Sequence, residues 1–314
     1  MATAEIKKPI ARQDMSKLRW TLLEMKRNKT AYMMVAPYYL VFAIFTIAPV
    51  FISLILSFTS FNMLEFPVFV GLDNYMRLLF DDEIFLTTVQ NTLLFAAFTG
   101  PASYLLAFLV AWFINELSPK MRAAVTLIFY APTISGTTFL IFGIIFSGDA
   151  YGIVNGFLLN HNLISSPILF FQQSDWIVPL IILVALWSSL GAGFLAFIAG
   201  LQSVDRSLYE AGAVDGIKNR WQELWYITLP SMRPMLMFGA ILSITGSFGF
   251  GPIVTALAGF PSHNYVAHTI MHHLEDYGGM RFEVGYASAI ATILFLMMIG
   301  ANLLVQKMLS KLGQ

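Results

Sequence analysis

The chain has 314 residues, of which 57% are hydrophobic and only 11% are charged, and its 18 basic residues balance 18 acidic ones. A soluble domain carries charge on roughly a quarter of its residues. This composition, with a mean hydropathy of +0.71, therefore excludes a soluble globular protein and indicates one surrounded largely by lipid. The absence of cysteine excludes disulfides and thiolate metal sites.

The chain begins with a basic arm, residues 1–30, which carries eight Lys and Arg residues. Acidic residues are interspersed among them, and the arm runs directly into an apolar segment. We therefore expect the arm to fix membrane topology and to contact anionic lipid rather than nucleic acid.

Six mostly apolar, uncharged runs follow the arm. Each is longer than the roughly 20 residues that a helix needs to cross the hydrocarbon core, and lipid-exposed backbone must satisfy its hydrogen bonds within the segment. The runs cover residues 31–58, 88–115, 123–146, 176–201, 234–257 and 284–305. The sequence therefore predicts an all-α integral membrane protein with six transmembrane helices.

Basic residues indicate the orientation of these spans. The arm contributes eight of them, and the segments after the second, fourth and sixth runs contribute two, four and two, so 16 of 18 fall on one side of a six-span model. Only Arg77 and Arg281 fall on the other side. The positive-inside rule then places both termini in the cytoplasm, with a membrane domain over residues 31–309 and a short tail over 310–314.

Ionisable residues are absent from the apolar runs, whereas proton- or sodium-coupled carriers usually depend on them. Of the five histidines, His268 and His272 have a spacing compatible with a metal site. No third ligand of matching geometry is visible, so we predict solvated loop histidines and no metal.

The fifth run contains the sequence Thr-Gly-Ser-Phe-Gly-Phe-Gly-Pro at residues 245–252. Glycines and proline weaken the helix there, and the stretch combines hydroxyls with aromatic rings. Apolar sugar faces stack on aromatic rings and sugar hydroxyls need small polar partners. This stretch is therefore a candidate site for a polar, ring-shaped solute.

A cytoplasmic segment, residues 202–234, lies between the fourth and fifth runs. Asp205 or Ser207 can cap a first short helix, and Asp215-Gly216 is a turn signal. Trp221, Leu224, Trp225 and Thr228 repeat at helical spacing and predict one face of a second short helix. The segment should form a compact helical pair that docks in a partner's groove.

This segment resembles the EAA loop of binding-protein-dependent ABC importer permeases, which inserts into the ATPase subunit. The matching residues are Glu210, Ala211, Asp215, Gly216, Ile227, Leu229 and Pro230. Two departures are Gly212 and Ile217, which stand where the family usually has alanine, and the loop is one residue longer than the commonest version. The resemblance implies a type I ABC importer permease fold, with ATPase coupling through Glu210, Ala211, Gly212, Asp215, Gly216, Leu229 and Pro230.

Resemblance to the carbohydrate branch extends along nearly the whole chain. The stretches 36–40, 69–75, 90–93, 259–261 and 285–289 are similar to segments of sugar permeases of the maltose and glycerol-phosphate type. The sugar-contacting positions of the maltose-type pore fall on Ser188, Ser189, Ala192, Thr245, Gly246 and Gly249. These side chains are smaller than those of the maltose-type protein, and Trp187, Phe248 and Phe250 remain as stacking surfaces.

The resemblance also implies an assembly in the bacterial cytoplasmic membrane. It would contain a second permease chain, two ABC ATPase subunits and an extracytoplasmic solute-binding protein, and this chain would be the first permease. No phosphate-binding loop occurs, so ATP and Mg would be bound by the partner ATPases, and this chain would be neither an enzyme nor a cofactor protein. Two alternatives stay open at this point: an ABC permease for a non-sugar solute, and a stand-alone carrier or channel.

Overall fold

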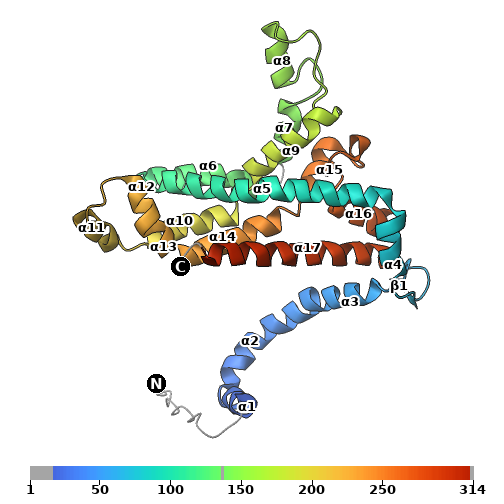
Figure 1. Cartoon of the computed structure of the whole chain (residues 1–314), viewed down its shortest axis with the longest axis horizontal. Helices are drawn as coiled ribbons and strands as arrows, with labels where there is room; N and C mark the ends of the chain where they lie inside the picture. Colours follow the sequence, from blue (N-terminus) through green and yellow to red (C-terminus); the bar gives the residue numbers. More distant parts are fainter. Residues whose placement is uncertain (1–16, 136–137, 312–314) are drawn as a thin grey trace. The chain divides into compact units, whose positions relative to one another are not determined.

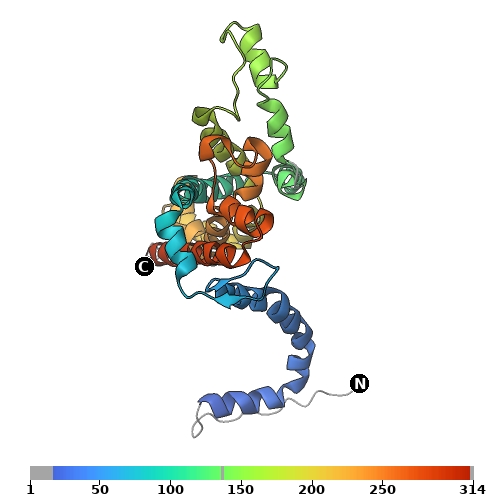
Figure 2. The same ribbon diagram turned by 90° about the vertical axis from the view of Figure 1, so that its right-hand side faces the viewer.

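A computed structural model describes residues 17–135 and 138–311. The chain divides into two compact units, Met1–Ile55 and Leu56–Gln314. Figures 1 and 2 show the helices of each unit from two directions. Much of the predicted basic arm and most of the tail lie outside the described residues.

The first unit is a series of helices with mostly exposed apolar side chains. The elements are α1 (Lys17–Arg27), α2 (Lys29–Phe42), a π-helical turn (Ala43–Ile47) and α3 (Ala48–Leu56). From Lys29 to Leu56 they form one span-length helix, and none of its most apolar window is buried. A helix that is apolar all round fits lipid or another membrane chain, as the first predicted span requires.

The second unit contains the other elements. In chain order they are β1 (Thr59–Ser60), β2 (Val68–Phe69), α4 (Asp73–Met76), η2 (Arg77–Asp81), α5 (Glu83–Asn115), α6 (Pro119–Ser135), α7 (Thr138–Ile145), α8 (Ile153–Asn160), α9 (Ser174–Ser188), α10 (Ala192–Ser203), α11 (Arg206–Val214), α12 (Arg220–Glu223), η3 (Leu224–Thr228), α13 (Leu229–Ser231), α14 (Arg233–Gly246), α15 (Gly251–Ala258), η4 (His263–Tyr265), α16 (Ile270–Glu275), η5 (Asp276–Met280) and α17 (Val284–Lys311). The strands are two residues long and pair antiparallel, so this hairpin is the only β-structure among the described residues.

Within the described residues, three helices are long and apolar enough to cross a membrane, or up to five if two bent pairs each count as one span. The three are Lys29–Leu56, Glu83–Asn115 and Val284–Met308, which coincide with the first, second and sixth predicted spans. The fourth predicted span is α9 and α10, bent by 43°. The second bent pair joins Arg220–Ser231 to Arg233–Gly246 at 82°, so it includes part of the predicted cytoplasmic segment. The third predicted run overlaps α6 and α7, and the fifth overlaps α14 and α15.

α5 runs along the second unit, and α10 and α14 pack against it (Figure 1). Close packing of α10 on α14 depends on Gly239, because a Cβ at that position would collide with the ring of Phe197. One buried cluster joins α5 and α10 around Phe194 and Phe197. A second joins α16 and α17 to the start of α5 around Tyr286, and a third joins α9 and α15 around Phe250.

The break between α14 and α15 falls at residues 247–250, inside the Gly-rich stretch that the sequence singles out. A Cβ added at Gly246 would meet no atom within 4 Å, so the backbone there borders open space. Pro252 lies in the first turn of α15, where its missing amide hydrogen costs nothing. Discontinuous helices of this kind are tolerated at membrane depth where they line a cavity.

Candidate functional site

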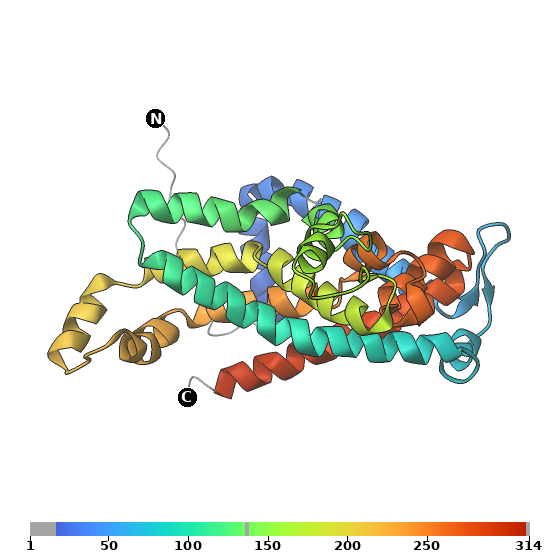
Figure 3. The ribbon, with the colours of Figure 1, turned by 90° about the horizontal axis from the view of Figure 1, so that it is seen from above.

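The segment between α10 and α14 folds as a helix, a turn and a second helix, as the sequence predicts. Asp205 caps α11 by accepting a hydrogen bond from the backbone N–H of Ser207 at 2.9 Å. Gly216 has φ of +94°, and the N–H of Ile217 donates to the carbonyl of Gly212 at 2.9 Å, which closes the helix end. Figure 3 shows the segment projecting beyond α10 and α14 at one end of the unit.

The two departures from the EAA pattern compensate each other. Gly212 is buried, and a Cβ there would lie 2.6 Å from the Cδ1 atom of Ile227 and 3.0 Å from that of Ile217. The larger Ile217 therefore occupies the room that Gly212 leaves, and the helical pair stays closely packed.

The predicted coupling residues divide between the surface and the interior. Glu210, Ala211, Asp215, Gly216 and Pro230 are exposed. Gly212 lies between the two helices, and Leu229 packs against the core around α5 and α10. The structure thus leaves five of the seven residues accessible on one projecting segment.

The prediction that Trp221, Leu224, Trp225 and Thr228 form one face of a second short helix is wrong. Leu224 and Thr228 are buried together with Ile227, whereas Trp225 is 67% exposed. The reason is the π-helical turn Leu224–Thr228, which the sequence pattern did not anticipate. Its wider turn moves successive residues off the 3.6-residue repeat on which the prediction rested.

A cavity of about 310 Å³ lies where α9 passes into α10 and α14 passes into α15. α5 supplies its third wall through Thr99, Ser103 and Ala107. Six residues predicted for the substrate pathway line it: Ser188, Ser189, Ala192, Gly246, Gly249 and Phe250. Two sequence stretches almost 60 residues apart are therefore brought to one site by the two helix breaks.

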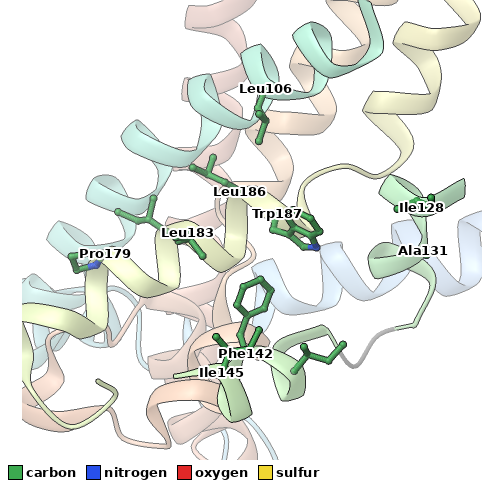
Figure 4. A pocket seen from close by; sticks show the side chains of 11 residues that line it. Leu106, Ile128, Ala131, Phe142, Ile145, Pro179, Leu183, Leu186 and Trp187 are labelled. Atoms are coloured by element: carbon green, nitrogen blue, oxygen red, sulfur yellow. The ribbon is translucent and has the colours of Figure 1, made fainter. Parts of the chain in front are cut away.

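Three predicted pathway residues lie elsewhere. Phe248 is buried in the cluster with Tyr286, and Thr245 is exposed outside the cavity lining. Trp187 packs beside Phe129, with ring centroids 6.2 Å apart, and lines a different cavity of about 960 Å³. Figure 4 shows that the side chains converging on that larger cavity, from α5, α6, α7 and α9, are apolar.

Sequence reasoning missed three hydroxyl residues that line the smaller cavity: Thr99, Ser103 and Ser243. Ser247, which also lines it, lies within the candidate stretch 245–252. Thr99 and Ser103 are one helical turn apart on α5, and this spacing was the available signal. Ser247 comes close to α5, since a Cβ on Gly100 would lie 3.3 Å from its Oγ.

The prediction of solvated histidines is wrong for three of the five. His268, His272 and His273 are 3%, 0% and 2% exposed, because α16 packs against α5, α15 and α17. His272 Nδ1 lies 2.9 Å from Thr269 Oγ1, and His273 Nε2 lies 2.8 Å from a carboxylate oxygen of Asp82. Among the described residues, no group of three or more His, Cys, Asp or Glu side chains could hold a metal ion.

His268 and His272 are uncharged near neutral pH. Burial lowers the pKa of His268 to about 4, and the neighbouring His272 and His273 add to the effect. Burial lowers the pKa of His272 to about 4 as well. These two histidines therefore act as packed, uncharged structural groups near neutral pH.

Helices of span length with exposed apolar side chains indicate an integral membrane protein. No family model matches the chain. It is 30% identical over 275 residues to the probable ABC transporter permease protein YesP of Bacillus subtilis, covering 86% of each chain. It is 29% identical to the arabinooligosaccharides transport system permease protein AraP of the same organism, covering 92% of this chain and 91% of that one.

Solved structures agree with these sequence relationships. The structure superposes on a chain of a bacterial ABC transporter that imports the acidic polysaccharide alginate, with a TM-score of 0.77 and 25% identity over 94% of this chain and 99% of that one. A second structure of an alginate transporter, in complex with alginate pentasaccharide-bound periplasmic protein, gives a TM-score of 0.71 at 24% identity, with 93% and 98% covered. The chain belongs to the family of sugar ABC transporter permeases.

Proposed function

We propose that this chain is one of two permease subunits of an ATP-driven, binding-protein-dependent importer of sugars or oligosaccharides in the bacterial cytoplasmic membrane. It would form half of the pore and couple to an ATPase subunit through the segment 202–234. The observation that carries the proposal is the exposed helical pair with Glu210, Asp215 and Gly216 on its surface, in a chain of this family.

The proposed topology has six spans and cytoplasmic termini. It combines the three span-length helices with α6–α7, α9–α10 and α14–α15 as interrupted spans. The placement of 16 of 18 basic residues on one side supports it. In this topology the helical pair 202–234 projects into the cytoplasm, residues 1–30 form a cytoplasmic arm, and residues 31–309 form the permease domain.

The proposed docking surface has features that suit insertion into a partner's cleft. The side chain of Glu210 is 74% exposed, and its Oε1 lies 3.7 Å from Nε of Arg206. An exposed ion pair at this distance is weak, so the carboxylate remains available to a partner. Val214 and Trp225 are 88% and 67% exposed on the same segment. An exposed apolar group rimmed by charge is the pattern of a protein interface.

The cavity lining favours an uncharged solute rich in hydroxyls. Among the described residues that line it, none carries a charge. Thr99, Ser247 and Ser189 donate their hydroxyl protons to carbonyls of their own helices at 2.7, 2.7 and 2.6 Å. Their oxygens are left as acceptors, which match sugar hydroxyl donors and offer nothing to a carboxylate or phosphate.

These features weigh against both alternatives. An amino acid or phosphate ester would bring a charge into a lining that cannot pair it, and burying an unpaired charge is costly. A stand-alone proton- or sodium-coupled carrier would need ionisable groups along its pathway. The free energy would instead come from ATP and Mg bound by two partner ATPases, and an extracytoplasmic binding protein would deliver the solute.

Uptake by right-side-out membrane vesicles tests the proposal. We expect ATP-dependent uptake of a labelled neutral oligosaccharide into vesicles that hold this chain with its native partners and binding protein. Labelled amino acids and sugar phosphates serve as the comparison set. Uptake that prefers a charged solute, or that proceeds unchanged without ATP, contradicts the proposal.

A further inference from the structure

The cytoplasmic-loop end of α5 is joined to the helical pair by an ion-pair bridge. Arg220, the first residue of α12, places Nη2 2.6 Å from Oε2 of Glu116, the C-cap residue that follows α5. Its other amino group, Nη1, lies 2.8 Å from Oε2 of Glu223 within α12. One guanidinium thus holds two carboxylates from different elements in the fork geometry that arginine provides.

An aromatic contact lies directly beside the bridge. The rings of Trp112 on α5 and Trp221 on α12 have centroids 5.1 Å apart. Trp112 is buried in the cluster that joins α5 to α10. Because Trp112 is fixed in this core, α12 is held against α5 by both an ionic and an aromatic contact.

The end of α5 is also stiffened from within. Arg122 on α6 donates through Nη2 to the carbonyls of Asn115 and Leu117, at 2.9 and 3.2 Å. A cation on the last carbonyls of a helix is favourable because it opposes the helix dipole. Displacement of α12 would therefore move the end of α5 as a body instead of unravelling its last turn.

The other part of α5 reaches the cavity. Ser103 lines the cavity and lies 13 residues before Glu116 in the sequence, which corresponds to about 20 Å along a helix. Gly100 and Pro101 adjoin it, and the proline removes a backbone hydrogen bond from the helix interior. Gly100 also lies against Ser247 in the break between α14 and α15. Movement of the end of α5 can thus be transmitted to the break between α14 and α15 beside the cavity.

We infer that Glu116 and Arg220 are positioning residues that transmit motion of the docking segment into α5, as a route separate from the chain connection through α13 and α14. This inference rests on the proposed function, because it needs an ATPase docked on the segment. Arg220 contacts neither the cavity nor, by the inference, the solute, and its role is to make α5 follow α12.

The test measures labelled sugar moved per ATP hydrolysed in proteoliposomes holding the complex purified through a tag on this chain. The probe is the best-transported member of a panel of lactose, arabinotriose and maltotriose. Glu116→Gln and Arg220→Met should lower the transport ratio about two- to fivefold, the range expected when an exposed charge pair is lost, while the ATPase still co-purifies. Glu223→Gln is the matched control, since it removes the contact of Arg220 within α12 and keeps the bridge to α5.

The exchange of charges, Glu116→Arg with Arg220→Glu, should restore at least half of the lost ratio because a bridge can form again. Equal ratios for wild type and Glu116→Gln would overturn the inference, as would an exchanged pair that is no better than either single variant. Wild-type complex that moves sugar without ATP would instead overturn the proposed function, so the two failures are distinguishable.

Discussion

Asp82 connects α5, α16 and α17 at one end of the second unit. Its carboxylate caps α5 by accepting from the backbone N–H of Phe85 at 2.9 Å. It also accepts from the hydroxyl of Tyr286 on α17 at 2.8 Å and contacts Nε2 of His273 on α16 at 2.8 Å. Burial opposes ionisation, but these hydrogen bonds outweigh it and lower the pKa of Asp82.

The cost of Asp82→Ala can be worked out from these contacts. Loss of the helix cap costs about 1 kcal/mol. The Tyr286 hydroxyl and the His273 ring nitrogen would each lose a partner in a buried site, at about 1–3 kcal/mol apiece. The sum is a fall of about 3–7 kcal/mol in the free energy of unfolding. Asp82→Asn keeps an acceptor for Phe85 and should cost less than half as much.

The assay is thermal unfolding of the detergent-purified chain, followed by tryptophan fluorescence. At about 2–4 °C per kcal/mol for a domain of this size, Asp82→Ala should lower Tm by at least about 6 °C. Asp81→Ala is the matched control, because Asp81 is the exposed neighbour, and it should change Tm by less than about 2 °C. A fall in Asp82→Ala no larger than that of Asp81→Ala would refute the reasoning.

Three further predictions concern pH, the cavity and the turn. Because the pKa values of His268 and His272 fall from 6.5 to about 4 on folding, the unfolded chain binds more protons between these values, and Tm should fall as pH is lowered from 6.5 to 4; His268→Phe should flatten this slope, and an unchanged slope would contradict the assignment. Gly246→Leu, whose side chain would enter the cavity, should cut uptake at least tenfold with the complex intact, whereas Gly300→Leu on α17, which also has open space around it, should not; equal effects would show that the cavity is not on the pathway. Gly216→Ala should strain the left-handed turn by about 1–2 kcal/mol and reduce ATPase co-purification, with Gly279→Ala as a comparison at ordinary φ; full retention of the ATPase would contradict a docking role for this turn.

The sequence predicted long, regular features well because each rests on a single physical requirement. Apolar runs of span length predicted the three span-length helices and the bent pair of α9 and α10. The cap at Asp205 and the turn at Gly216 were readable because capping and positive φ are local properties. Six of nine predicted pathway residues line one cavity. The resemblance to the maltose-type pore located the stretch 188–192, and the helix-weakening residues located the stretch 245–252.

The errors arise where tertiary packing decides. Polarity alone suggested solvated histidines, but α16 is enclosed by three helices, and each of His272 and His273 finds a polar partner inside. Trp187 packs beside Phe129 and lines the larger cavity, apart from the six predicted pathway residues that share the smaller one. The π-helical turn at Leu224–Thr228 changes which residues of the second short helix are buried. A search for a 3.6-residue repeat cannot detect such a turn.

The proposed function requires that ATP hydrolysis by a partner drives transport through contacts made by the segment 202–234. The most direct test is uptake of labelled oligosaccharide by vesicles holding the full complex, compared between wild type and Glu210→Ala. Glu210 is exposed on the segment, so the substitution should leave folding and membrane insertion intact, and uptake should depend on ATP and fall at least tenfold in the variant. Uptake that is indifferent to both ATP and the substitution would contradict this coupling role.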